Sequence, residues 1–116
     1  MAREIEELQA ELRRFAEERD WGHFHSPRSL AASLSIEAAE VLEHFQWLTD
    51  EQSRRLNDAR RQAVAHEIAD VFLHLLQLFD RLRIDPPQAG RDKLALNEQR
   101  CPADKPRGGA RKYTEL

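Results

Sequence analysis

Two long segments with helical periodicity, joined by a short connector, constrain the fold of this chain more than any other feature. In residues 27–48 and 60–83 the apolar side chains recur every three to four positions, the spacing of one helix face. The predicted buried positions are Leu30, Leu34, Val41, Leu42, Phe45 and Leu48 in the first segment, and Val64, Ile68, Val71, Phe72, Leu75, Leu78, Phe79 and Leu82 in the second. Because the connector is too short for a parallel crossover, we expect the two helices to pack antiparallel.

The rest of the chain also favours helix. It contains only four glycines, and residues 3–19 carry an apolar seam with helical spacing. Ser26–Pro27 has the composition of a helix start with proline at the first position, and Thr49–Gln52 that of a capping box. Asp85–Pro87 ends one helix and begins another that reaches about Arg100. No segment has the pattern of a convincing strand.

These elements predict an all-α fold of four or five helices. We expect residues 1–100 to form a single helical domain and residues 101–116 to form an extended tail. The tail contains a Gly pair and few apolar residues, and it is predicted to dock on the bundle or on a neighbouring subunit. An elongated helical chain of 116 residues is also expected to need a partner to bury its apolar stripes.

Composition argues against several partners and locations. The chain has 21 acidic and 18 basic residues and a formal charge of −3, which disfavours a general affinity for nucleic acid or anionic membranes. Its single cysteine, Cys101, fits a reducing compartment. The charged first residues do not resemble a signal peptide, and no run of 18 apolar residues exists. We therefore expect a cytoplasmic protein with neither a nucleic-acid nor a membrane partner.

Both long helices carry a pair of acidic residues at the border of the apolar stripe. Glu37 and Glu40 in the first helix, like Glu67 and Asp70 in the second, are three positions apart and share one face. In an antiparallel pair the two acidic faces can meet, which would bring four carboxylates into a partly buried cleft. Two unit charges about 4 Å apart repel by about 4 kcal/mol at an effective dielectric constant of about 20, so such a cluster favours a counter-charge.

A divalent cation would relieve this repulsion. The ligands on offer are oxygens, with no cysteine and no histidine at the spacing of a zinc site, so Mg²⁺, or alternatively Mn²⁺, is favoured. Mg²⁺ usually keeps several waters and binds phosphate oxygens, which indicates a phosphorylated substrate. A single Glu-x-x-Glu pair is typical of a solvated helix face, and from the pattern alone both interpretations stay open.

Other residues could complete a nucleotide site. Lys93, Asn97 and Arg100 form one cationic and amide-bearing helix face that could hold phosphate oxygens. A second group consists of side chains with aromatic rings, which could stack on a nucleobase or pack in a core: Trp21, Phe24, His25 and Trp47. His44 and His74 follow the acidic pairs on the same helix faces and are interpreted as neighbours of the site rather than as ligands.

An ordered set of motifs resembles a known family. The chain contains Trp-x-x-Phe-His-x-Pro-Arg, Glu-x-x-Glu, Phe-Gln-Trp and Glu-x-x-Asp in this order, together with the stretches IDPPQA, DKLALNEQR and RKYTEL. This set resembles the MazG-type all-α nucleoside triphosphate pyrophosphohydrolases, and among them the dCTP pyrophosphatase branch. The resemblance extends from about Phe15 to Leu116.

The resemblance implies Mg²⁺-dependent hydrolysis of a nucleoside triphosphate, dCTP or a modified dCTP, to the monophosphate and pyrophosphate, a reaction that cleanses the nucleotide pool. The implied metal ligands are Glu37, Glu40, Glu67 and Asp70. Either Glu37 or Glu40 would take the proton of the attacking water, and the sequence does not choose between them. Together with the cationic face, the predicted substrate-binding residues are Trp21, Gly22, His23, Phe24, His25, Trp47, His74, Lys93, Asn97 and Arg100.

The family also implies a homo-oligomer, a dimer or a tetramer, with sites formed between subunits. Two positions depart from the branch: His74 stands where tyrosine is common, and Leu12 where some members have histidine, so the base preference stays open. Two rival functions remain. One is a di-iron oxidase, whose Glu-x-x-His motifs this chain lacks. The other is a non-enzymatic helical interaction module with an ordinary acidic surface.

Overall fold

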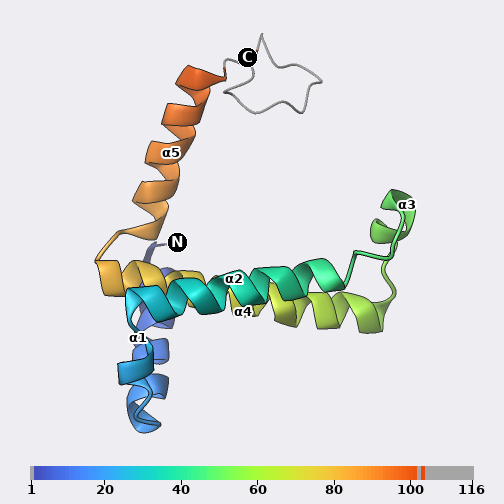
Figure 1. The fold of residues 1–116 in the computed structure, drawn as a ribbon. Helices are drawn as coiled ribbons and strands as arrows, with labels where there is room; N and C mark the ends of the chain where they lie inside the picture. The colour runs from blue at the N-terminus through green and yellow to red at the C-terminus, as the bar shows by residue number, and fades with distance from the viewer. Residues whose placement is uncertain (1, 102, 104–116) are drawn as a thin grey trace. The chain divides into compact units, whose positions relative to one another are not determined.

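The computed structural model describes residues 2–101 and residue 103. The chain divides into two compact units, residues 1–83 and residues 84–116, whose positions relative to each other are not determined. Within the described residues every regular element is helical, as the sequence predicts. The elements are α1 (Ala2–Glu18), the short 3₁₀ helix η1 (Gly22–Phe24), α2 (Pro27–Glu43), α3 (Asp50–Ser53), α4 (Asp58–Leu82) and α5 (Pro86–Arg100) (Figure 1).

A pair of long antiparallel helices forms the centre of the first unit. α2 and α4 lie side by side (Figure 1), in the arrangement that the short connector predicts. Leu30 of α2 and Leu76 of α4 are buried, each with only 2% of its surface exposed, and Val64 of α4 is buried as well. Removal of this apolar surface from water is the main favourable term for the pairing.

α1 packs on the C-terminal half of α4 through polar contacts as well as apolar ones. The side-chain amide of Gln9 donates a hydrogen bond of 3.0 Å to the backbone carbonyl oxygen of Leu76. The Arg13 guanidinium donates to both carboxylate oxygens of Asp80, each at 2.7 Å. These contacts fix the end of α1, and with it the turn that leads into η1.

The helix starts follow the predicted capping chemistry. The Ser26 hydroxyl accepts a hydrogen bond from the backbone N–H of Ser29, with proline at the first position of α2. Thr49 and Gln52 form the reciprocal bonds of a capping box at the start of α3. Both predictions are confirmed.

The end of α2 differs from its prediction. The helix ends at Glu43, whereas the apolar pattern continues to Leu48. After Glu43 the backbone N–H groups of Phe45 and Leu48 donate to carbonyl oxygens three residues back, at 2.9 Å each, so the chain continues as turns. The apolar spacing persists through these turns, which is why the sequence did not reveal the boundary.

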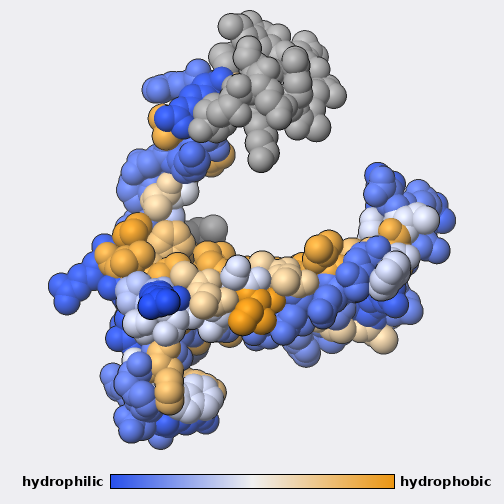
Figure 2. Space-filling model, viewed as in Figure 1, coloured by the Kyte–Doolittle hydropathy of each residue, from blue (hydrophilic) through white to orange (hydrophobic). Residues whose placement is uncertain are grey.

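The core of the first unit is smaller than the sequence predicts. Among the described residues, the buried apolar side chains are Ala16, Leu30, Val64 and Leu76. Five predicted core positions are exposed instead: Leu42, Ile68, Phe72, Leu75 and Leu82. The reason is geometric, because α1 and α2 cover only part of the circumference of α4. Apolar residues consequently gather in open patches along α2 and α4 (Figure 2).

The second unit contains α5, which begins where the sequence predicts. The Asp85 carboxylate accepts a hydrogen bond from the backbone N–H of Gln88, and Pro86 occupies the first helical position. The residues of α5 from Gly90 onward are exposed, including Leu94 and Leu96. The predicted docking of the tail lies outside the described residues, and the predicted domain boundary at residue 100 stays a prediction. No helix in the described range combines the length and the apolarity needed to cross a bilayer.

Candidate metal and nucleotide site

Three of the four predicted acidic ligands meet between α2 and α4. Glu37 of α2 and Glu67 and Asp70 of α4 each offer a carboxylate oxygen, and these oxygens all lie within 4.8 Å of one another. Glu67 and Asp70 share one face of α4 because they are three residues apart. The antiparallel pairing places Glu37 opposite them. We call these three residues the acidic cluster.

The acidic cluster is partly enclosed by its helices. Glu37 and Glu67 are half-buried, whereas Asp70 is exposed. One carboxylate oxygen of Glu37, Oε2, is fully buried and has no hydrogen-bond partner in the structure. A buried anionic oxygen without a partner is costly, and a cation held by the three carboxylates would supply the missing interaction. The donor set, made only of carboxylate oxygens, fits a hard divalent ion.

Glu40, the fourth predicted ligand, lies beside the acidic cluster rather than within it. Its side chain lies within hydrogen-bonding reach of Glu67 and of Glu37. The hydrogen bond to Glu67, followed by the negative charge of Glu37, raises the pKa of Glu40 from 4.5 to about 7. In such a bond the protonated carboxyl of Glu40 donates, since two carboxylates cannot share a hydrogen bond without a proton.

Two histidines border the acidic cluster. His44 Nε2 lies 3.6 Å from Glu67 Oε1, and only 26% and 18% of the two side chains are exposed. His74 is half-buried on α4, and its Nδ1 lies 2.7 Å from the backbone carbonyl oxygen of Asp70, to which Nδ1–H donates. These contacts hold the His44 ring next to Glu67 and the His74 ring next to Asp70.

The predicted aromatic loop lies where α1 joins α2. The Trp21 ring packs edge-on against Phe15 of α1, with ring centres 5.6 Å apart, and remains partly exposed. The rings of His23 and Phe24, which belong to η1 together with Gly22, lie 3.9 Å apart. α1 therefore supplies one wall for the aromatic residues of this loop.

His25 is half-buried and lies close to Arg81 and His74 of α4. Burial, then the positive charge of Arg81, then that of His74, lower the pKa of His25 from its ordinary value. The imidazole is therefore neutral at neutral pH, with one nitrogen as donor and the other as acceptor.

Sequence reasoning missed a small cavity next to this histidine. The cavity, about 10 Å³ in volume, is lined by residues of α1 and α4 that include Gln9, Arg13, Gln77 and Arg81, together with His25. The side-chain oxygen of Gln77 is buried and has no hydrogen-bond partner. A cavity of this size holds about one water molecule. Gln77 follows Asp70 by seven residues and His74 by three. This spacing places Gln77 on the same face of α4 as these two residues, and it could have predicted a polar group there.

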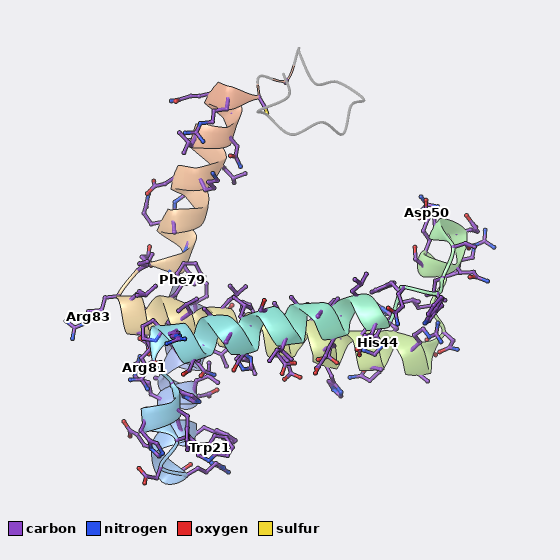
Figure 3. All side chains as sticks on the ribbon, viewed as in Figure 1. Trp21, His44, Asp50, Phe79, Arg81 and Arg83 are labelled. Carbon is purple, nitrogen blue, oxygen red and sulfur yellow. The ribbon has the colours of Figure 1, made fainter. Side chains whose placement is uncertain are left out.

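Trp47 does not share a pocket with Trp21 within one chain. Trp21 precedes α2 and Trp47 follows it, and a 17-residue helix is about 25 Å long. Figure 3 shows Trp21 beside the outer part of α1 and His44 at the far end of the α2–α4 pair. Trp47 is 87% exposed and lies beyond the end of α2 at Glu43.

The remaining predicted substrate residues belong to the second unit. Lys93, Asn97 and Arg100 are exposed on α5. Their spacing places them on one face of the helix, as predicted. Their relation to the acidic cluster stays a prediction.

Comparisons with known proteins identify the family. Residues 32–116 match the model of the MazG-like family. The chain is 42% identical to dCTP pyrophosphatase 1 of Homo sapiens and 41% identical to that of Bos taurus, in each case over 97% of this chain and 66% of the relative. This chain therefore corresponds to slightly less than two-thirds of the length of these relatives.

A solved structure agrees with this result. The crystal structure of a pyrophosphatase from Archaeoglobus fulgidus matches with a TM-score of 0.80 and 41% identity, over 85% of this chain and 93% of that one. The helical architecture is therefore that of a known relative. The chain belongs to the MazG-like family.

Proposed function

We propose that this protein is a Mg²⁺-dependent nucleoside triphosphate pyrophosphohydrolase. Its substrate is dCTP or a modified dCTP, its products are the monophosphate and pyrophosphate, and its role is to cleanse the nucleotide pool. The observation that carries the proposal is the convergence of Glu37, Glu67 and Asp70 within 4.8 Å. The names of the relatives, dCTP pyrophosphatase 1 and a pyrophosphatase, support the reaction class.

The acidic cluster would hold Mg²⁺, or Mn²⁺ in its place. Glu37 presents a buried oxygen with no partner, and Glu67 and Asp70 face it from α4. When bound, the ion neutralises charge on the phosphates and lowers the pKa of water. Glu37, Glu67 and Asp70 would hold the ion, and the half-buried Glu37 and Glu67 would keep its position fixed between α2 and α4.

Glu40 is the best-placed residue to accept the proton of the attacking water. It lies outside the acidic cluster, so its carboxylate is not needed to complete the three ligands. In the metal-free protein Glu40 holds a proton and hydrogen-bonds to Glu67. A bound cation would displace that proton, and the freed carboxylate beside Glu67 could then accept one from water. A general base in this place removes the proton as water attacks phosphorus, and the pyrophosphate departs. Glu37, the other predicted candidate, is the less suitable base because it belongs to the cluster.

The active form is proposed to be a homodimer or a homotetramer. Ile36, Ile68, Phe72 and Leu75 leave large apolar surfaces uncovered on α2 and α4. Exposed apolar surface of this kind often marks protein–protein contacts. A second copy could also bring its own Trp47 to the nucleotide site, which a single chain leaves distant from Trp21.

Sedimentation analysis tests the assembly. The wild-type protein should sediment as a dimer or a tetramer, and Phe72→Glu should shift it towards the monomer because a charge then replaces an apolar contact. The matched control is Glu43→Gln, an exposed position at the end of α2, which should sediment like the wild type. A monomeric wild-type protein would contradict this part of the proposal.

A nucleotide panel tests the activity. The purified protein is incubated with dCTP, 5-methyl-dCTP, dTTP, dUTP or dATP in the presence of Mg²⁺, and pyrophosphate release is measured. We expect release to be fastest with dCTP or its 5-methyl derivative, and to be abolished by a chelator and by Glu67→Ala. If no nucleotide is turned over, the non-enzymatic interaction module becomes the better explanation of the helical fold.

A further inference from the structure

A histidine at the end of α2 contacts the acidic cluster and has no role in the proposed reaction so far. His44 Nε2 lies 3.6 Å from Glu67 Oε1. This distance exceeds a direct hydrogen bond, and a small rotation of either side chain would close it. Both side chains are mostly buried, so water competes less for the contact than it would at an open surface.

The backbone fixes the place of His44 relative to the cluster. The residue caps α2 in a helical conformation, and its N–H donates to the carbonyl oxygen of Val41 at 3.2 Å. Because it follows Glu37 by seven residues and Glu40 by four, it lies on the same face of α2 as these carboxylates. The antiparallel packing then places its ring opposite Glu67 of α4.

Glu67 needs such a neighbour more than the other carboxylates do. It faces the carboxylates of Glu37 and Asp70 within 4.8 Å and interacts with Glu40 as well. Before a cation binds, repulsion favours rotation of Glu67 away from the cluster. A hydrogen bond from His44 to one oxygen of Glu67 would oppose that rotation and leave the other oxygen available to the cluster. Partners of this kind commonly hold carboxylates that bind metals.

We propose that His44 is a positioning residue, which holds the Glu67 carboxylate in the orientation that binds the divalent cation. This inference rests on the proposed metal site. The imidazole acts through Glu67 and itself binds neither the cation nor the nucleotide. Its loss should therefore weaken cation binding and raise the Mg²⁺ concentration that half-saturates the activity. At saturating Mg²⁺ the KM for the nucleotide should stay close to the wild-type value.

Titration with Mn²⁺ in the absence of nucleotide tests the proposal directly. Free Mn²⁺ is followed by electron paramagnetic resonance in the wild type and in His44→Leu, His44→Gln and His66→Leu. We expect His44→Leu to weaken Mn²⁺ binding by about 10- to 100-fold. His44→Gln should retain most of the affinity, because its amide nitrogen can also donate to Glu67. His66→Leu is the matched control, since His66 is exposed on α4 and contacts Gln62.

The outcomes separate the positioning role from the metal site itself. Wild-type affinity in His44→Leu, or equal losses in His44→Leu and His44→Gln, would overturn the positioning role. Failure of the wild type to bind Mn²⁺ would overturn the metal site as well. Circular dichroism checks that each variant is folded. If His44→Leu is not folded, His44→Asn replaces it, because the shorter asparagine amide does not reach Glu67. The His44→Asn protein should then bind Mn²⁺ as weakly as is expected for His44→Leu.

Discussion

Folding of a single chain brings the residues of the acidic cluster together but leaves the two tryptophans far apart. Glu37, Glu67 and Asp70 come from two helices and already meet within 4.8 Å. Trp21 and Trp47 flank the same helix, α2, and stay at its opposite ends. The first set is assembled by one helix pair, whereas the second set is separated within one chain by the length of α2, which agrees with the proposed assembly of several copies.

This difference follows from where the two sets stand in the fold. Residues within a helix have their relative positions set by its pitch, and antiparallel pairing adds one further constraint. Residues in the turns before and after a helix are separated by its whole length. A site that contains both sets would therefore take its metal ligands from one chain and part of its base pocket from another.

The largest expected effect concerns the acidic cluster. Asp70→Asn removes the charge of one member while keeping its size, and we expect kcat/KM for pyrophosphate release to fall by about 10²- to 10³-fold. Glu43→Gln makes the same chemical change on α2 outside the cluster and should leave kcat/KM unchanged. Equal effects of the two substitutions would show that net charge, rather than the cluster, controls activity.

The aromatic residues should affect nucleotide binding without affecting the cation. Trp47→Ala is expected to raise the KM by about 5- to 150-fold, because stacking on a base contributes roughly 1–3 kcal/mol. Mn²⁺ binding in the absence of nucleotide should not change, since Trp47 is exposed and lies beyond the end of α2. Weaker Mn²⁺ binding in this variant would break the distinction between the two sets.

Metal binding should depend on pH through Glu40. Because its pKa is raised to about 7, the metal-free protein holds a proton that cation binding must displace. Mn²⁺ affinity should therefore fall by about tenfold per pH unit as the pH drops below about 7. Calorimetric titrations at several pH values measure this slope, and Glu40→Gln should flatten it. A slope that survives in Glu40→Gln would assign the proton to another group.

The same pKa gives a prediction for folding stability. Between pH 4.5, the ordinary pKa of this carboxyl, and about 7, the folded state binds more protons than the unfolded state. The contribution of Glu40 to the stability of the metal-free protein therefore decreases as the pH rises through this range. Thermal unfolding should consequently show a larger rise in Tm on adding Mg²⁺ at pH 8 than at pH 6.

The smallest expected effect concerns the attachment of the aromatic loop. Arg13→Ala removes the ion pair with Asp80 and should lower the free energy of unfolding by about 0.2–1 kcal/mol, because the half-exposed Arg13 leaves the pair accessible to solvent. Denaturant titration measures this change, with Arg14→Ala as the neighbouring control. Mn²⁺ affinity should remain that of the wild type, because α1 contributes no residue to the acidic cluster.

Much of the first unit could be predicted from local chemistry. Ser26 and Thr49 cap the helices that they were expected to cap, and the antiparallel pairing followed from the short connector. The core was predicted less well. Ile68 and Phe72 have the spacing of buried residues but are exposed, because periodicity marks an apolar face without showing what covers it.

The candidate site was also predicted only in part from the sequence. The spacing of Glu37, Glu40, Glu67 and Asp70 was sufficient to place them on facing helix surfaces. It was not sufficient to show that Glu40 lies beside the other three, because a side-chain position of that precision depends on the packing between the helices. The contact between His44 and Glu67 likewise joins residues far apart in the sequence.

The amino-acid sequence alone determined the helices, their caps and the faces that carry acidic residues, because these depend on interactions within a few residues of each other. Only the tertiary structure decided which carboxylates meet, which apolar residues remain exposed and which histidine contacts Glu67. These outcomes depend on the axial shift and rotation of one helix against another. Small differences in packing set both quantities, and no short stretch of sequence encodes them.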